Sequence, residues 1–138
     1  MRLTAKERVL LHLLEFAKSA DAPEVPVELT QRGVRVATGI DVRHFAQYVR
    51  PLVRQGVVRE RTAHVRGLLH RRKVYVLTDD GRRKATGIRE RVGSTTVHVR
   101  DGLATRTATV AEILRKARGS RSLLQIVRDA IEDDAVDL

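Results

Sequence analysis

Apolar residues at helical spacing open the chain. Thr4 and Glu7 match a capping box, in which each side chain bonds the backbone N–H of the other residue. The apolar positions that recur behind them along one face are Val9, Leu10, Leu13, Leu14 and Ala17. This pattern predicts a helix to about Lys18, followed by a loop with two prolines and room for a short edge strand.

Two short helices are predicted next. Thr30 is placed to cap the first, which ends before Gly39, and Asp41 is placed to cap the second, which ends before Gly56. The second helix carries an apolar stripe that we expect to pack on the two helices before it. The members of this stripe are Val42, Phe45, Ala46, Val49, Leu52 and Val53.

A β-hairpin and a fourth helix follow. The hairpin is predicted from a strand at 57–65, a turn beginning at Arg66-Gly67 and a returning strand at 73–77. Thr78 is a good N-cap for a helix that reaches Arg91. The hairpin tip is rich in basic residues.

The last third of the chain predicts a second hairpin and two more helices. The expected elements are strands at 95–100 and 103–108 joined through an Asp101-Gly102 turn, a helix from Thr109 to Gly119 and a helix from Arg121 to Asp133. The last helix has an apolar stripe of Leu123, Leu124, Val127 and Ile131, which is a candidate dimer interface. Packing of this stripe within the chain is an equal alternative.

The order of elements over Thr30–Leu77 is typical of a winged helix-turn-helix, which offers one helix to a DNA major groove and a basic hairpin to the flanking backbone or minor groove. We therefore expect an α+β protein with a three-helix core and a β-wing, followed by a C-terminal β-hairpin and two helices. The expected domains are residues 1–91 for the winged part and residues 92–138 for an extension that dimerises or docks.

Composition narrows the range of partners. The chain has 138 residues, a formal net charge of +10 and a pI near 11.1, which favours polyanions. Thirteen Lys or Arg and four Asp or Glu lie between Arg50 and Arg91, whereas the last ten residues hold five acids and no base. The sequence has no cysteine, no apolar run of about 20 residues and no signal peptide pattern, so a cytoplasmic protein without contact to a membrane is the expectation.

Two groups of exposed polar residues are the candidate DNA contacts. On the helix before Gly56 they are Arg43, His44, Gln47, Arg50 and Arg54; on the wing they are Arg66, His70, Arg71, Arg72 and Lys73. Arg43 could read guanine, Gln47 could read adenine, and the arginines further along would meet phosphates. The alternative is a solvated surface, and Leu68 and Leu69 at the wing tip instead suggest packing against another element or subunit.

Residues 4–85 resemble the MarR-like winged helix-turn-helix family, in the versions associated with archaeal regulators. The residues that carry the resemblance are Leu3–Leu10, Leu29–Gln31, Gly39–Ile40, Gln55–Val58 and Lys73–Thr78 before Gly81. It implies a sequence-specific DNA-binding dimer in which the helix before Gly56 reads the site. The chain departs from the family at Arg35 and Tyr48, which could stack as a cation–π pair, and at Pro51, which should kink the reading helix.

The leading hypothesis is a transcriptional regulator that binds double-stranded DNA as a homodimer. The alternative is a protein-interaction module of a larger signalling system, and association with RNA or ribosomes is a weaker third. No catalytic, cofactor-binding or metal-binding pattern is found: the five histidines lack ligand spacing, and His12 fits the edge of a helix core. The sequence assigns no target site or small-molecule effector, and it does not say whether the native chain ends at Leu138.

Overall fold

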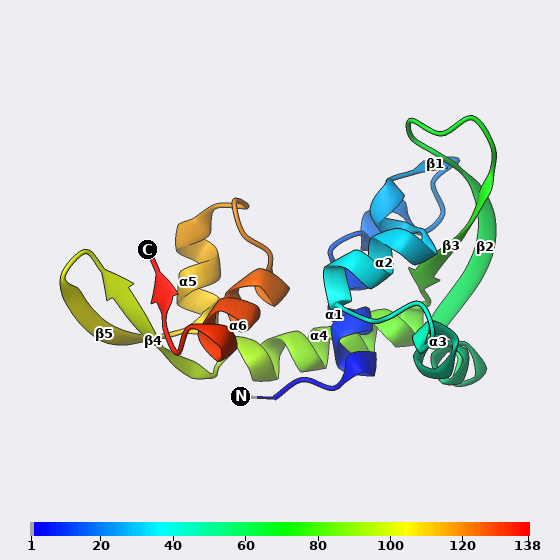
Figure 1. The fold of residues 1–138 in the computed structure, drawn as a ribbon. Coiled ribbons are helices and arrows are strands. Elements are labelled where there is room, and N and C mark those ends of the chain that lie inside the picture. The colour runs from blue at the N-terminus through cyan, green and yellow to red at the C-terminus, as the bar shows by residue number, and fades with distance from the viewer. Residues whose placement is uncertain (1) are drawn as a thin grey trace. The chain divides into compact units, whose positions relative to one another are not determined.

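The computed structural model describes residues 2–138 and has an α+β fold (Figure 1). Within those residues it contains six α-helices and two small three-stranded sheets, each with one parallel and one antiparallel strand pair. The chain divides into two compact units. The first unit contains residues 3–86, and the second contains residues 87–138 together with Arg2.

The first unit carries three helices and a sheet in the order β1-β2-β3. Its elements are α1 (Ala5–Leu14), β1 (Glu24–Val25), α2 (Gln31–Thr38), α3 (Phe45–Arg54), β2 (Val58–Val65), β3 (Arg72–Leu77) and the first part of α4 (Asp79–Gly93). Single 3-10 turns lie at Ala17–Ser19 and Val27–Leu29. Figure 1 shows β2 and β3 as a long hairpin whose loop extends beyond the helices of this unit.

Threonine caps start three of these helices as the sequence predicts. Thr4 and Glu7 form the full capping box of α1, and Thr30 accepts a hydrogen bond from the backbone N–H of Gly33 at α2. Thr78 does the same for Gly81 at α4, with an N–O distance of 3.0 Å. The helix α1 stops at Leu14 rather than Lys18, because its last turn tightens into i→i+3 backbone bonds.

The predicted cap of α3 is wrong. Asp41 does cap a turn, but its carboxylate accepts from the backbone N–H of Arg43 (2.8 Å), and the helix begins only at Phe45. An Asp side chain readily bonds a backbone N–H two residues on, and this local bond competes with a helix N-cap. Val42 consequently lies outside the helix and is exposed, so the buried stripe of α3 is Phe45, Val49 and Leu52.

An aromatic contact joins α3 to the hairpin. The ring of Phe45 meets the ring of Tyr75 on β3 nearly edge-on, with centroids 5.2 Å apart and an interplanar angle of 69°. Such pairs contribute about 0.5–1.5 kcal/mol beyond their burial. The rest of this core is aliphatic and includes Val34, Leu52 and Val74, all fully buried. The contact sets the orientation of α3 on the sheet.

The second unit packs two helices on a sheet in the order β5-β4-β6. Its elements are the end of α4, β4 (Thr96–Asp101), β5 (Ala104–Thr109), α5 (Val110–Ala117), α6 (Leu123–Glu132) and β6 (Val136–Asp137). The short strand β6 pairs parallel to β4 and was not predicted. Val99, Ile113, Ile126 and Val136 form the fully buried centre of this unit.

The hairpin turn of this unit is shifted by one residue from the prediction. Asp101 pairs with Ala104, so the two turn residues are Gly102 and Leu103 rather than Asp101 and Gly102. Gly102 has a φ of 63°, which a glycine adopts without steric cost and which type II′ hairpin turns require at this position. Leu103 is thereby left fully exposed at the tip.

The apolar stripe of α6 is divided between core and surface. Leu123 and Val127 are buried within the unit, Leu124 is half-buried and Ile131 is exposed. Two members of the proposed dimer interface therefore pack inside the same chain. None of the helices among residues 2–138 is both long and apolar enough to cross a membrane.

The close approach of α4 to the start of β2 gives a stability prediction. A methyl group on Gly81 would lie 1.9 Å from the carbonyl oxygen of Val57, so Gly81→Ala should lower the free energy of unfolding by about 2 kcal/mol or more. Gly87→Ala lies in the same helix, and its methyl meets no described atom within 4 Å. It should raise stability by up to about 1 kcal/mol. Chemical denaturation measures the free energy of unfolding of both variants. Equal values would contradict the close packing of Gly81 against Val57.

Candidate nucleic-acid interface

The outer face of α3 and the turn before it collect polar side chains. Gln47, Arg50 and Arg54 stand three and four residues apart along α3, and all three are exposed. Arg43 and His44 precede them in the turn and are exposed as well. The buried residues of α3 occupy the opposite face, so the sequence prediction of an outward-facing set on this helix agrees with the structure. What these residues bind is a separate question.

Arg43 is held by a neighbouring carboxylate. Its Nε lies 3.1 Å from Oδ1 of Asp41, and its backbone N–H donates to the same oxygen. The backbone and then the side-chain hydrogen bonds from Arg43 lower the pKa of Asp41 below its usual value of 3.8. The carboxylate is therefore ionised over the whole neutral range, and it orients a guanidinium that remains 78% exposed. Asp41 was predicted from the sequence to be the N-cap of α3, so its pairing with Arg43 was not predicted.

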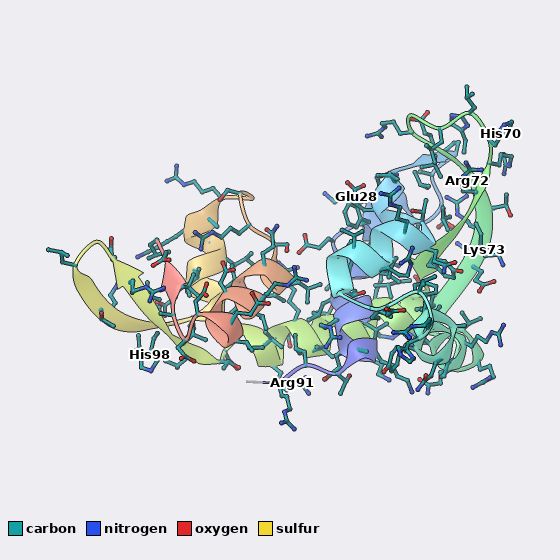
Figure 2. All side chains as sticks on the ribbon, viewed as in Figure 1. Glu28, His70, Arg72, Lys73, Arg91 and His98 are labelled. Atoms are coloured by element: carbon teal, nitrogen blue, oxygen red, sulfur yellow. The ribbon has the colours of Figure 1, made fainter. Side chains whose placement is uncertain are left out.

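The two faces of the hairpin carry different cations. Residues directly opposite on β2 and β3 share a face, so Lys73 lies with Thr62 while Arg72 lies with Ala63. Side chains alternate along a strand, which puts Lys73 on the same face as Tyr75, the residue that contacts α3. Arg72 points to the other face. Figure 2 shows Arg72 and Lys73 along the hairpin, below His70 near its tip.

This face of the hairpin contains two residues that the sequence did not single out. Thr62 and His64 alternate with Arg61 and Ala63, are exposed, and lie on the α3 side together with Lys73. Lys73 is 3.8 Å from the carboxylate of Glu60 on the same face. The alternation of side chains along β2 puts Thr62 and His64 on one face of the strand. That this face is the one with Lys73 and Tyr75 follows only from the register between β2 and β3.

The loop of the β2–β3 hairpin is bonded to neighbouring strands at both of its ends. Arg66 forms an ion pair with Glu24 (3.1 Å), and its backbone N–H donates to the carbonyl of Val25 in β1. Arg71 donates from Nη2 to the carbonyl of Thr62 (2.9 Å). All five predicted wing residues are exposed: Arg66, His70, Arg71, Arg72 and Lys73.

Net charge is concentrated in the first unit. Residues 3–86 contain seventeen Lys or Arg and nine Asp or Glu, a net charge of +8. Residues 87–138 contain nine basic and eight acidic residues, a net charge of +1. The unit that holds α3 and the hairpin therefore also carries most of the chain's net positive charge.

The sequence was compared with protein-family models and with curated proteins. No family model matches the chain, and no curated protein matches it significantly. The assignment of function rests on the geometry and charge of the chain itself.

Other candidate sites are weaker. His12 is buried, its Nε2–H donates to the carbonyl of Glu28 (2.8 Å), and burial lowers its pKa, which fits a neutral core residue. Within residues 2–138 no three His, Asp or Glu side chains cluster as metal ligands. A cavity of about 440 Å³ includes Arg59 and Arg82, but Asp21 and Asp79 pair with these arginines.

The residues at which the chain departs from the MarR-like family lie between core and surface. Arg35 and Tyr48 are both half-buried, and Nε of Arg35 is buried without a hydrogen-bond partner. The helix α3 continues through Pro51 to Arg54. The cation–π stacking of Arg35 on Tyr48 and the kink at Pro51 remain predictions.

The pairing of Arg43 with Asp41 predicts a measurable titration. In an NMR pH titration of the Asp41 carboxyl carbon, the pKa should lie below 3.8. Arg43→Ala should raise it only part of the way back, because the backbone N–H of residue 43 still donates to Asp41. Arg50→Ala, which removes an exposed arginine of α3, should leave the pKa of Asp41 unaltered. An unshifted pKa in the native protein would contradict the pairing.

Proposed function

We propose that the chain is a winged helix-turn-helix protein that binds double-stranded DNA in a sequence-specific manner and regulates transcription. The observation that carries this proposal is one surface of the first unit. There the buried face of α3 packs against the Tyr75 face of the β2–β3 hairpin through the Phe45–Tyr75 contact, and the polar face of α3 is left exposed, in a unit of net charge +8. Helix and basic hairpin together match the two parts of a winged DNA reader.

In this proposal the N-terminal end of α3 enters the major groove. Arg43, oriented by Asp41, reads the acceptors of a guanine, and Gln47 reads an adenine. His44 contacts a base or a phosphate. Arg50 and Arg54 lie one and two turns further along the same exposed face, where they meet phosphates and add affinity that does not depend on sequence.

The hairpin acts as the wing. Lys73, Thr62 and His64 lie on the side of the hairpin that faces α3. In the proposal they contact the DNA backbone next to the major-groove site. His70 and Arg71 at the tip reach further, to the phosphates or the minor groove. Arg72 points to the opposite face and is assigned a smaller part than the sequence suggested.

Two copies of the chain would read a palindromic site in the cytoplasm, as the resemblance to MarR-like regulators implies. Since Leu123 and Val127 are buried within the chain, a dimer contact through α6 would use Leu124 and Ile131. Of these, Ile131 is 52% exposed.

A second candidate function is a protein-interaction module in a larger signalling system. It is favoured by two exposed valines of the first unit: Val36 on α2 is 71% exposed, and Val42, next to Arg43 before α3, is 57% exposed. Apolar side chains at these positions would suit a protein partner. Retained partner binding after neutralisation of Arg43, Arg50 and Arg54, without any DNA binding, would favour this alternative.

Fluorescence anisotropy with genomic and scrambled duplexes over a range of salt concentrations tests the DNA-binding proposal. Arg54→Ala and Lys73→Ala should weaken binding to both duplexes alike and should each reduce the salt slope by about 0.9. Arg43→Ala should mainly reduce the preference for the genomic duplex. Arg72→Ala should have a smaller effect than Lys73→Ala.

Arg115→Ala on α5 is the matched control, because it removes an exposed arginine from the nearly neutral second unit. It should leave affinity and salt slope close to those of the native protein. Absence of salt-sensitive binding at low ionic strength would overturn the proposal. Equal effects of Arg43→Ala, Lys73→Ala and Arg115→Ala would overturn the assignment of the surface.

A further inference from the structure

The most exposed large apolar side chain of the first unit lies at the wing tip. Leu69 is 93% exposed, and the residues after it are His70, Arg71 and Arg72. A single exposed leucine on a protein surface needs no explanation by itself. Leu69 is unusual because it lies at the end of a hairpin, within three residues of Arg66, Arg71 and Arg72. A partner that covers Leu69 must also offer negative charge to these arginines.

The loop around Leu69 is fixed from both sides. The backbone N–H of Leu68 donates to the carbonyl of Val65 (3.0 Å), and Gly67 between them has a φ of 83°, so the chain turns tightly. Arg66 is tied to Glu24, and Arg71 is tied to the carbonyl of Thr62. Leu68 is half-buried, so of the two leucines only Leu69 is fully presented outward.

The chemistry of the tip restricts what can accept Leu69. A partner must offer an apolar crevice for one side chain and negative charge on both sides of it. An apolar pocket on a protein would have to desolvate the neighbouring arginines, which is costly unless each is paired. The DNA minor groove fits both conditions, since phosphates line its edges and a partly unstacked base step accepts an apolar wedge.

We propose that Leu69 is such a wedge: it enters the minor groove beside the α3 site, opens one base step and bends the duplex toward the major groove. The inference rests on the proposed DNA binding and adds to it a way in which the bound duplex is bent. Pyrimidine–purine steps unstack most readily. The wing therefore selects a TA or CA step at the position it reaches, although its side chains make no hydrogen bond that reads those bases.

The chain offers a matched control at its other hairpin. Leu103 is also fully exposed at a β-hairpin tip, between β4 and β5. Its neighbours are Asp101, Gly102, Ala104 and Thr105, and no arginine lies within two residues of it; Arg100, three residues before it, is paired with Asp137 (2.8 Å). Leu69→Ala and Leu103→Ala remove the same group from similar tips in different charge environments, and neither side chain is part of a core.

The experiment measures bending of a bound duplex by energy transfer between dyes at its two ends, with 2-aminopurine at the TA step as a reporter of unstacking. The full chain and Leu103→Ala should shorten the end-to-end distance and raise the 2-aminopurine fluorescence. Leu69→Ala should keep salt-sensitive binding but lose both responses. Unchanged thermal unfolding of Leu69→Ala shows that the variant is folded.

The outcomes separate this inference from the proposed function. Binding by Leu69→Ala with undiminished bending and unstacking overturns the wedge and leaves DNA binding in place. Absence of binding to any duplex by the native chain overturns the proposed function and the wedge together. Leu69-dependent binding to vesicles of phosphatidylserine and phosphatidylcholine, without DNA bending, also overturns the wedge and assigns the tip to a membrane surface.

Discussion

The contact of Phe45 with Tyr75 determines which surfaces of the first unit remain available. The chain has only two phenylalanines and two tyrosines, so half of these rings meet at this one point. With Phe45 turned inward, Val49 and Leu52 follow it into the core, and Gln47, Arg50 and Arg54 are left outside. With Tyr75 turned toward α3, strand alternation brings Lys73, Thr62 and His64 to the same side. One packing choice thus defines both halves of the proposed interface.

Charge follows the same division of the chain. The unit that contains this proposed interface has a net charge of +8, whereas residues 87–138, which form most of the other unit, have a net charge of +1 and include the acidic C-terminal residues. In the proposed function, the attraction of phosphates to this charge is long-ranged and independent of sequence, and it brings a duplex to the first unit. The proposal assigns the selection of a particular sequence to Arg43 and Gln47 and, in the wedge inference, to Leu69.

Local hydrogen bonds explain why much of the fold could be predicted from the sequence. Thr4, Thr30 and Thr78 cap helices through bonds that span three residues, so the residue types alone identify them. Asp41 and the Asp101-Gly102 pair were misassigned because the same residue types also satisfy neighbouring turns. The strand β6 depends on Val136 pairing with Val99, a distant contact that no local pattern encodes. The exposure of the site residues was predictable, but the side on which Arg72 and Lys73 lie depends on strand register.

In the proposed function, the outer face of α3 and the Tyr75 face of the hairpin receive duplex DNA. Backbone amide NMR shifts of the full chain, followed while duplex DNA is added, show which residues the duplex contacts. We expect salt-sensitive shifts at Arg43–Arg54, at Thr62 and His64, and from Leu69 to Lys73, with little change in β4, β5 and α6. Shifts confined to the second unit, or no shifts at low ionic strength, would contradict this proposal.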